Sequence, residues 1–391
     1  MRRSKIPILL CLPVLLAAPL LSGCASARAE GAGAPCPTGQ VAREGGCVPS
    51  DSEDFVRRQV AESLKKYALT ASMAEVWIDG KRVWSTAAGE SMTGVPATTD
   101  MHFRTGAVAI PYLTTALLRL VDEGRVSLDD KLSTWRPELP HADEITVRML
   151  ASTTSGYADY VTDPKFDAAL YANPFRQWTA PELVRLSVSK PLVKPPGSGF
   201  VYSHANWVLL GDVISRVAKK PLERVVREDV FAPMGLTQSA VPATAEIPAP
   251  VLHGFDNERG VFEDSTYWNP SWTLAPGAVT TGTLGDMAKS FTSIGQGKLL
   301  SPKSHAEQLK PVSAVSPTVS YSLGLAVANS WILQNPSFAG YEGAVAYLPS
   351  RKLAIATVAT QGKGSTVQNA ATEVLREIAV HLAPEKPFEA R

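Results

Sequence analysis

The sequence has almost no excess of charge of either sign, with 38 Lys and Arg against 37 Asp and Glu and a formal net charge of +1. Loss of the first 23 residues, which contain three basic residues and no acidic ones, would change this to about 1 − 3 = −2. Binding to nucleic acid depends on a basic surface that neutralises phosphates. Neither value provides such a surface, so we expect no nucleic-acid partner.

Several motifs of enzymes are also absent. The sequence contains no G-x-S-x-G nucleophile elbow, no H-E-x-x-H zinc motif and no glycine-rich phosphate-binding loop. What is present is a globular composition, with 45% hydrophobic and 19% charged residues. The 391 residues suffice for one large domain or two ordinary ones.

Residues 1–23 have the pattern of an export signal: basic residues at the start, then an apolar run, then small residues before a cysteine. Leu21, Ser22 and Gly23, followed by Cys24, resemble the bacterial lipobox, in which cleavage leaves the cysteine as a lipidated N-terminus. We therefore expect Cys24 to anchor the protein to the outer, extracytoplasmic face of the cell membrane. The alternative is an ordinary secretory signal in which this cysteine has no role. No later apolar run reaches the roughly 18 residues needed to cross a bilayer.

Residues 24–52 are rich in Ala, Gly, Pro and Ser, a composition typical of a spacer. Within this spacer, Cys36 and Cys47 flank a loop that contains glycines and would lie outside the reducing cytosol. We therefore predict a disulfide between them. The two further Cys or His ligands of a zinc site are missing, and we expect no metal and no cofactor.

The pattern of residues 53–384 indicates one domain of mixed α and β structure. Apolar residues at helical spacing predict a first helix over residues 51–66, and Asp79-Gly80 joins two strand-like runs into a predicted hairpin. Near the C-terminus, two strands are expected on either side of a turn at Ser350-Arg351, followed by an amphipathic helix. The tail, residues 385–391, is polar and is expected to be loose.

Residues 103–110 read Phe-Arg-Thr-Gly-Ala-Val-Ala-Ile, at the start of a predicted amphipathic helix that stops near Gly124. This stretch resembles the F-R-x-G-S-x-x-K motif of the serine β-lactamase-related family, which includes class C β-lactamases, D-alanyl-D-alanine carboxypeptidases and esterases. In that family the serine accepts the acyl group, and the lysine lies one helical turn further on. The same register here holds Ala107 and Ile110, which can neither attack a carbonyl nor take up a proton. We expect these two positions to form an ordinary buried helix start.

The family's second motif is altered as well. Residues 195–239 resemble its P-P-G-x-x-F-x-Y-S-N segment and the helices that follow, with Tyr202 at the catalytic tyrosine and His204 in place of the asparagine. A phenol has a usual pKa near 10 and needs a neighbouring cation to act as a base at neutral pH. We therefore expect Tyr202 to serve packing and His204 to be a satisfied or partly exposed loop histidine.

The third motif, Lys-Thr-Gly or His-Thr-Gly, lies in the family on a sheet strand that borders the pocket. It aligns here with Gln334, Asn335 and Pro336. The cation is missing, and proline cannot donate a backbone hydrogen bond. This strand shapes the oxyanion hole of family members, where loss of one donor typically costs on the order of 100- to 1,000-fold in rate.

The resemblance covers residues 53–384 and implies an α/β (α+β) fold of the β-lactamase/transpeptidase type. In this fold an antiparallel sheet, built from the N-terminal hairpin and the C-terminal strands, is flanked by helices. An inserted helical subdomain contains Ala107 and Tyr202. Two other S-x-x-K runs, Ser63–Lys66 and Ser187–Lys190, lack the F-R-x-G context. Ser155 occupies a structural position of the family.

Two hypotheses about function follow. The first is a membrane-anchored pseudoenzyme that binds a cell-wall peptide, a glycolipid or a protein partner without turning it over. The second is an active hydrolase, similar to an esterase, a peptidase or a β-lactamase, in which His204 or Tyr202 activates Thr105, a serine elsewhere or water. The coordinated change of all three motifs favours the first.

Overall fold

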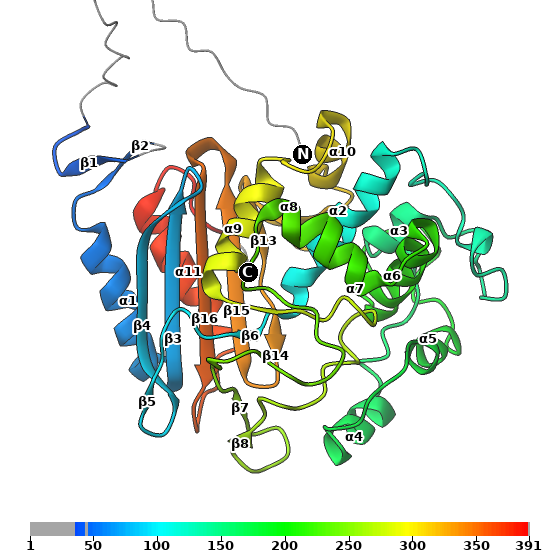
Figure 1. The fold of residues 1–391 in the computed structure, drawn as a ribbon, viewed down its shortest axis with the longest axis horizontal. Coiled ribbons are helices and arrows are strands. Elements are labelled where there is room, and N and C mark those ends of the chain that lie inside the picture. The colour runs from blue at the N-terminus through cyan, green and yellow to red at the C-terminus, as the bar shows by residue number, and fades with distance from the viewer. Residues whose placement is uncertain (1–35, 44–45, 390–391) are drawn as a thin grey trace, which may run out of the picture. The chain divides into compact units, whose positions relative to one another are not determined.

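One antiparallel sheet organises the part of the chain that the computed structural model describes, residues 36–43 and 46–389. Its ten strands follow the order β10, β11, β12, β13, β15, β16, β3, β4 and β5, with β14 paired to β15 (Figure 1). Their bounds are β3 (Leu69–Ile78), β4 (Lys81–Met92), β5 (Val95–Pro96), β10 (Ser313–Ala314), β11 (Val319–Tyr321), β12 (Ala326–Ala328), β13 (Trp331–Gln334), β14 (Ser337–Phe338), β15 (Tyr341–Leu348) and β16 (Leu353–Gln361). The N-terminal hairpin joins the C-terminal strands through β3 and β16, as the sequence predicts.

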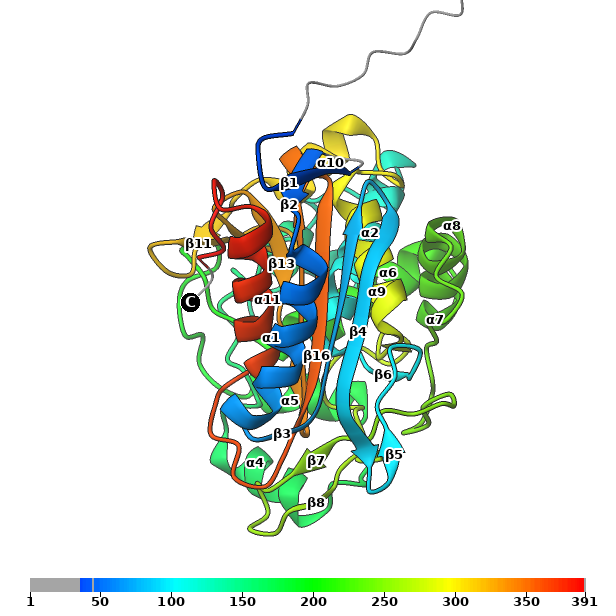
Figure 2. The ribbon, with the colours of Figure 1, turned by 90° about the vertical axis from the view of Figure 1, so that its left-hand side faces the viewer.

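The two central strands, β15 and β16, are buried along almost their whole length because helices cover both faces of the sheet. Helices α1 (Ser52–Lys66) and α11 (Ala370–Leu382) lie side by side on one face (Figure 2), and α9 (Leu284–Gly295) packs on the other. Most buried positions of β15 and β16 are small residues, mainly Ala and Val, which let the helices approach the sheet closely.

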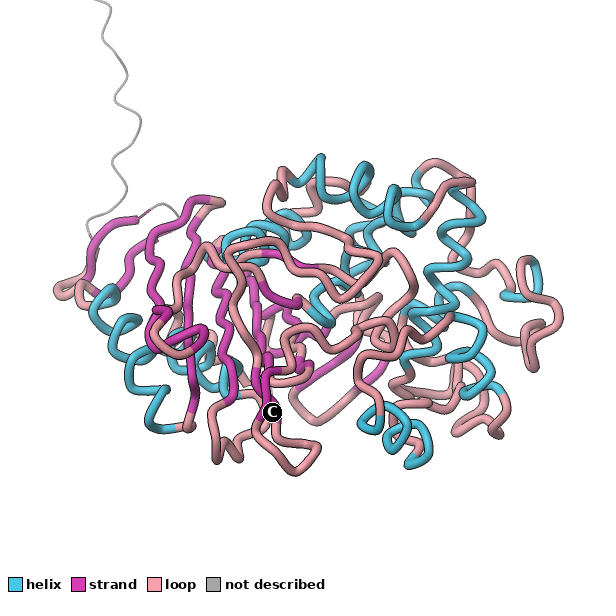
Figure 3. The backbone as a smooth tube through the Cα atoms, turned by 60° about the horizontal axis from the view of Figure 1, so that its bottom comes forward, coloured by secondary structure: helices cyan, strands magenta, loops and turns pink. Residues whose placement is uncertain are grey.

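A helical half is inserted between β5 and β10, as expected, and it lies at one side of the sheet (Figure 3). Its helices are α2 (Ala109–Asp122), α3 (Val147–Ala151), α4 (Pro164–Ala172), α5 (Ala180–Val188), α6 (His204–Ala218), α7 (Leu222–Val225), α8 (Ala232–Met234) and α10 (Pro302–Leu309), together with α9. Short strands add two ladders, β6 (Phe103–Arg104) with β9 (Thr281–Gly282) and β7 (Phe255–Asp256) with β8 (Glu263–Asp264). Among the described residues, no helix has the length and apolar character needed to span a membrane.

The turn between β3 and β4 confirms the predicted hairpin. Asp79 and Gly80 have φ angles of +49° and +77°, and a two-residue hairpin turn of this kind needs positive φ at both central positions. Ile78 and Lys81 pair directly across the turn. The Asp-Gly sequence therefore sets the register of the strands that carry the N-terminal part of the sheet.

The expected spacer, residues 24–52, is partly folded. Strands β1 (Gln40–Arg43) and β2 (Gly46–Pro49) form a hairpin, and both Cys36 and Cys47 are disulfide-bonded. Val48 is buried in the same apolar cluster as α1, and Arg351 donates a hydrogen bond to the carbonyl of Cys47 at 2.7 Å. The second half of the spacer is thus part of the domain surface, while residues 24–35 lie outside the described residues.

The expectation of a loose C-terminal tail is wrong for its described part. Phe388 is only 2% exposed and meets Trp331 edge to face at 5.8 Å between ring centroids. The Trp331 indole donates to the carbonyl of Lys386 at 2.8 Å, and the Asn329 amide donates to the carbonyl of Pro387 at 2.9 Å. One apolar side chain with these backbone contacts is enough to fix the segment, although its composition is polar.

Candidate functional site

A pocket of about 720 Å³ opens where the helical half meets the sheet and the start of α11. Six of the seven positions singled out from the sequence line its wall, namely Ala107, Tyr202, His204, Gln334, Asn335 and Pro336. The structure therefore brings together residues from three distant parts of the chain. The seventh position, Ile110, does not line this pocket.

The segment that the resemblance aligns with the family's nucleophile is a short 3₁₀ turn, Gly106–Val108, that leads directly into α2. Ala107 is half-buried and presents a methyl group to the pocket. Ile110 is 1% exposed and packs in the main apolar core, where a Cβ on Gly324 would lie 3.1 Å from Ile110 Cγ2. We expected both positions to be buried at the helix start. This is confirmed for Ile110 and wrong for Ala107, because the pocket extends to the 3₁₀ turn that contains Ala107.

Tyr202 lies in an aromatic part of the wall. Its ring is 6.4 Å from each of the rings of Phe200 and Trp207 and 5.2 Å from the His204 ring, measured between centroids. Burial raises the pKa of Tyr202 above its usual value. A phenol with a raised pKa stays protonated at neutral pH, so Tyr202 can donate a hydrogen bond but is a poor general base.

His204 is not a loop residue but the first residue of α6, after Ser203 at the N-cap. Its Nδ1 lies 3.0 Å and 3.1 Å from the two carboxylate oxygens of Asp159, and its backbone N–H donates to the same carboxylate at 3.2 Å. Ser203 has the extended backbone of an N-cap residue, but its hydroxyl donates to the carbonyl of Ala158 at 3.1 Å, so the Asp159 carboxylate accepts the first helical N–H in its place.

Asp159 is the partner that sequence reasoning missed. It is 45 residues from His204 along the chain, and no local pattern links the two. Its sequence signal is its place four residues after Ser155, which occupies a structural position of the family. A carboxylate on Nδ1 fixes the ring orientation and leaves Nε2 for other contacts.

The third motif position begins at the last residue of β13. The Gln334 side chain is buried and donates from Nε2 to the carbonyl of Gly324 at 2.7 Å. Pro336 packs against the 3₁₀ turn, since a Cβ on Gly106 would lie 2.7 Å from the Pro336 ring. The sheet strand is therefore interrupted between β13 and β14, and Pro336 supplies no N–H to the pocket.

Asn369, at the N-cap of α11, holds this interrupted segment in place. Its side-chain amide donates to the carbonyls of Asn335, Pro336 and Gly343 at 3.0, 3.1 and 3.1 Å. Its Oδ1 accepts the backbone N–H of Thr372 at 3.0 Å. A single side chain thus connects the third motif position to the first turn of α11, both of which line the pocket.

The other candidate nucleophiles are held by internal hydrogen bonds. The Thr105 hydroxyl is bonded to the Thr280 hydroxyl, and the side chain is 3% exposed. The Ser155 hydroxyl donates to Asn206 at 2.6 Å. The Ser63 hydroxyl donates to the carbonyl of Val60 in the same helix, and the Ser187 hydroxyl donates to the carbonyl of Ala158 in a neighbouring loop. None of these four lines the pocket.

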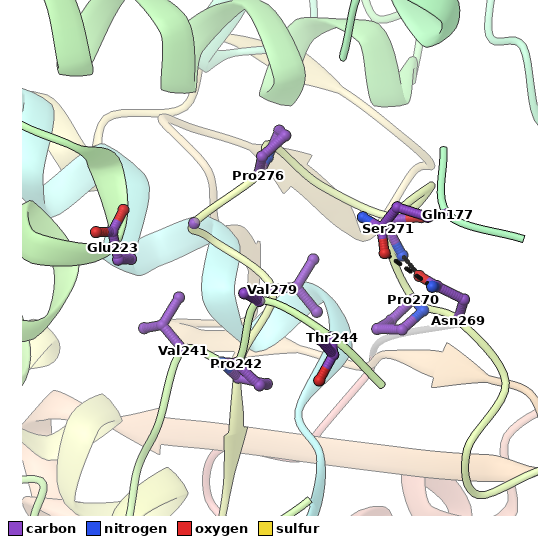
Figure 4. A pocket seen from close by; sticks show the side chains of 12 residues that line it. Gln177, Glu223, Val241, Pro242, Thr244, Asn269, Pro270, Ser271, Pro276 and Val279 are labelled. Carbon is purple, nitrogen blue, oxygen red and sulfur yellow. Dashed lines mark hydrogen bonds between the residues drawn. The ribbon is translucent and has the colours of Figure 1, made fainter. Parts of the chain in front are cut away.

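A second pocket, of about 330 Å³, is lined by loop residues of the helical half and by Glu223 of α7 (Figure 4). In it, the Asn269 amide donates to Gln177 at 2.8 Å, and the Ser271 hydroxyl accepts a hydrogen bond from the backbone N–H of Trp178. None of the positions singled out from the sequence lies there. Over residues 36–43 and 46–389, no cluster of three His, Cys, Asp or Glu side chains has the arrangement of a metal site.

Comparisons with known protein sequences agree with this architecture. The family model described as Beta-lactamase matches residues 56–379. The uncharacterized protein MT1414 of Mycobacterium tuberculosis is 32% identical over 192 residues, which are 44% of this chain and 47% of the relative. Esterase EstB of Burkholderia gladioli is 30% identical over 204 residues, 48% of this chain and 52% of the esterase. The chain thus spans about half the length of these curated relatives.

Among solved structures, a D-stereospecific amidohydrolase from Streptomyces sp. is similar with a TM-score of 0.74. The sequence identity is 23%, and the match covers 84% of this chain and 98% of the amidohydrolase. A likeness at this identity concerns the fold. It confirms the predicted architecture of an antiparallel sheet flanked by helices, of the β-lactamase/transpeptidase type.

The buried position of Ile110 predicts the effect of putting back the lysine of the family motif. In Ile110→Lys, an ammonium group would replace a side chain that is 1% exposed in the apolar core, so we expect a loss of about 3–5 kcal/mol in the free energy of unfolding. Ile110→Met, which keeps volume and polarity, should cost less than about 1.5 kcal/mol. Urea denaturation at pH 7 measures both. A lysine variant as stable as the parent protein would contradict the core assignment of this position.

Proposed function

Because the chain belongs to the beta-lactamase family, we propose that it is a pseudoenzyme of this serine hydrolase family, which binds a ligand in the pocket and does not form an acyl-enzyme. The observation that carries the proposal is the methyl group of Ala107. It lies on the pocket wall at the position where the resemblance places the acyl-accepting serine. Acyl transfer needs an oxygen or sulfur nucleophile at this point and a base within reach of its proton.

The surroundings of Ala107 support the same conclusion. The position of the family's lysine is filled by Ile110 in the apolar core. The hydroxyl of Thr105, two residues before Ala107, is bonded to Thr280. Burial raises the pKa of Tyr202. The position of the family's lysine holds Ile110, so it supplies no cation that would lower this pKa.

The third motif position lacks the groups that would stabilise a tetrahedral intermediate from this side. The Gln334 amide nitrogen already donates to Gly324, and Pro336 has no N–H. Donors aimed at the developing oxyanion are usually a large part of catalysis. The pocket itself persists, with a volume in the range of small-molecule sites. We therefore expect binding of a cell-wall peptide, a glycolipid or a protein segment.

Intact-mass spectrometry of the purified protein tests this proposal. We expect no mass increase after incubation with benzylpenicillin or, separately, with a fluorophosphonate, because the pocket offers no nucleophile in the required position. An active esterase of the same family, labelled in parallel, is the positive control. A stoichiometric adduct would overturn the proposal, and peptide mapping would then identify the nucleophile.

A second candidate function, an active hydrolase with a different base, is favoured by one contact. Asp159 holds His204 through Nδ1, which leaves the other ring nitrogen as a possible proton acceptor from a water molecule in the pocket. The imidazole also lies next to Tyr202, at 5.2 Å between ring centroids.

This candidate predicts that measurable hydrolysis of p-nitrophenyl butyrate falls by about 100-fold or more in His204→Ala. His253→Ala is a matched control, because His253 makes a similar contact with Asp264, at 2.7 Å, away from the pocket. The initial rates of both variants and the parent protein decide the matter. A rate that is the same in all three would rule out His204 as the base.

We also propose that Cys24, which lies outside the described residues, is lipidated and holds the domain at the outer face of the cell membrane. The proposal is supported by the sequence Leu-Ser-Gly-Cys after an apolar run. In a bacterial host fed an alkyne analogue of palmitate, the protein should be labelled and found in the membrane fraction. Cys24→Ser should lose the label, whereas Cys36→Ser should keep it. Equal labelling of Cys24→Ser and the parent protein would rule out this anchor.

A further inference from the structure

We propose that the pocket of about 720 Å³ binds a small primary amine with an apolar body, and that the ammonium group of this ligand donates a hydrogen bond to Nε2 of His204. This inference rests on the proposed function, since it takes the pocket as a binding site. It goes further by naming the chemical class of the ligand, the atom that recognises its charged group, and Asp159 as the residue that positions this atom.

The contact with Asp159 decides which ring nitrogen of His204 carries the proton. Nδ1 lies 3.0 Å and 3.1 Å from the two carboxylate oxygens, and an ionised carboxylate can only accept hydrogen bonds. Nδ1 therefore carries the proton, and in the neutral ring Nε2 keeps its lone pair. The same carboxylate accepts the backbone N–H groups of His204 and Val161, each at 3.2 Å, which fixes the carboxylate against the start of α6.

Nε2 of His204 is accessible to a ligand. The His204 side chain is 19% exposed and lines the pocket, whereas Asp159 does not line it. Nε2 makes no hydrogen bond with the described residues, yet it is not one of their buried polar atoms without a partner, so it retains accessible surface. A lone pair of this kind is completed by a hydrogen-bond donor. The ligand therefore needs an N–H or O–H group.

The charges near His204 favour an ammonium group over a neutral donor. In the described part of the chain, Asp159 pairs with His204 and with no lysine or arginine. The start of α6 balances part of its negative charge, and the remainder attracts a cation. Arg376 on the pocket wall pairs with Glu373, so its charge is offset as well. A hydrogen bond with an ionised donor is roughly twice as strong as a neutral one.

Aromatic rings lie beside His204 on the pocket wall. The Tyr202 ring is 5.2 Å from the His204 ring and at 88° to it, and the Phe200 ring is 6.4 Å from the Tyr202 ring, measured between centroids. The face of an aromatic ring attracts a cation within about 6 Å. Val315 and Val319 continue the apolar part of the wall. These side chains can contact the apolar body of an amine bound at Nε2.

A carboxylate ligand fits this part of the wall less well. It would meet the lone pair of Nε2 and the negative charge of Asp159 behind the ring. The third motif position, which holds a cation in the family, is the neutral Gln334, whose amide nitrogen already donates to the carbonyl of Gly324 at 2.7 Å. Pro336 has no N–H to offer. The wall therefore selects against an anion.

Calorimetric titration of the purified protein at about pH 8, where an imidazole is ordinarily neutral, tests the ligand class with four ligands of similar shape. Benzylamine carries the ammonium group, and benzyl alcohol replaces it with a neutral hydroxyl. Benzyltrimethylammonium keeps the charge without an N–H, and benzoate is an anion. We expect benzylamine to bind about 5- to 30-fold more tightly than benzyl alcohol. Benzyltrimethylammonium should bind more weakly than benzylamine, and benzoate should bind most weakly.

Asp159→Asn tests the positioning carboxylate. The amide oxygen can still accept from Nδ1 of His204, so the ring orientation is kept while the charge is removed. We expect the affinity for benzylamine to fall about 3- to 10-fold and the affinity for benzyl alcohol to stay the same. Asp264→Asn is the matched control, because Asp264 makes a similar contact with His253, at 2.7 Å, and neither residue lines the pocket. The control should bind both ligands like the parent protein.

The ratio of the two affinities separates recognition from a structural role of Asp159. Both affinities are measured on one preparation, so a fraction of unfolded protein does not change their ratio. A purely structural role would weaken the two ligands alike. His204→Phe, which keeps a ring and removes Nε2, should lower the affinity for benzylamine to that for benzyl alcohol, and His253→Phe is its control. If a variant does not fold, the four ligands still test the parent protein.

Absence of benzylamine binding at millimolar concentration, or affinity no higher than that for benzyl alcohol or benzoate, would overturn the ligand class. Equal binding of benzylamine and benzyltrimethylammonium, or unchanged selectivity in both Asp159→Asn and His204→Phe, would overturn the role of His204. Failure of the proposed function is a separate outcome, because it would appear as a covalent adduct in the mass experiment whatever the selectivity for the amine.

Discussion

The contact between Pro336 and Gly106 joins the two halves of the molecule at the pocket. The proline ring fills the space that a side chain at residue 106 would need, and Gly106 has a φ of +52°, where glycine is favoured. Gly343 leaves room for the same ring from the other side, with a Cβ position 3.1 Å away. The position of Ala107 on the wall depends on this packing. So does the interruption between β13 and β14.

The residues at the positions that resemble the family's motifs are connected by packing and hydrogen bonds. With an aliphatic side chain at residue 110, the core closes against Gly324, whose carbonyl then binds the amide of Gln334. Proline at residue 336 has no N–H to donate to a neighbouring strand. The side-chain amide of Asn369 donates hydrogen bonds to the carbonyls of Asn335 and Pro336. The fold at these positions is thus held by core packing and by hydrogen bonds to backbone carbonyls, and fold alone does not establish activity.

Local signals in the sequence predicted much of the architecture. Asp79-Gly80 set a hairpin turn, and the resemblance of residues 103–110 placed Ala107 beside Tyr202 and Gln334 although they lie far apart in the chain. The contact of Asp159 with His204 could not be read in this way, because it depends on how a loop packs against a helix start 45 residues later.

The packing of the C-terminal segment against the sheet affects where a fusion partner or affinity tag can be attached. Phe388 is held against Trp331, the first residue of β13, and Gln334 at the other end of the same strand lies in the pocket wall. One four-residue strand therefore links the C-terminal segment to the pocket wall. A fusion partner or affinity tag should therefore be joined after an intact Phe388, because loss of this residue would remove the contact of the segment with Trp331.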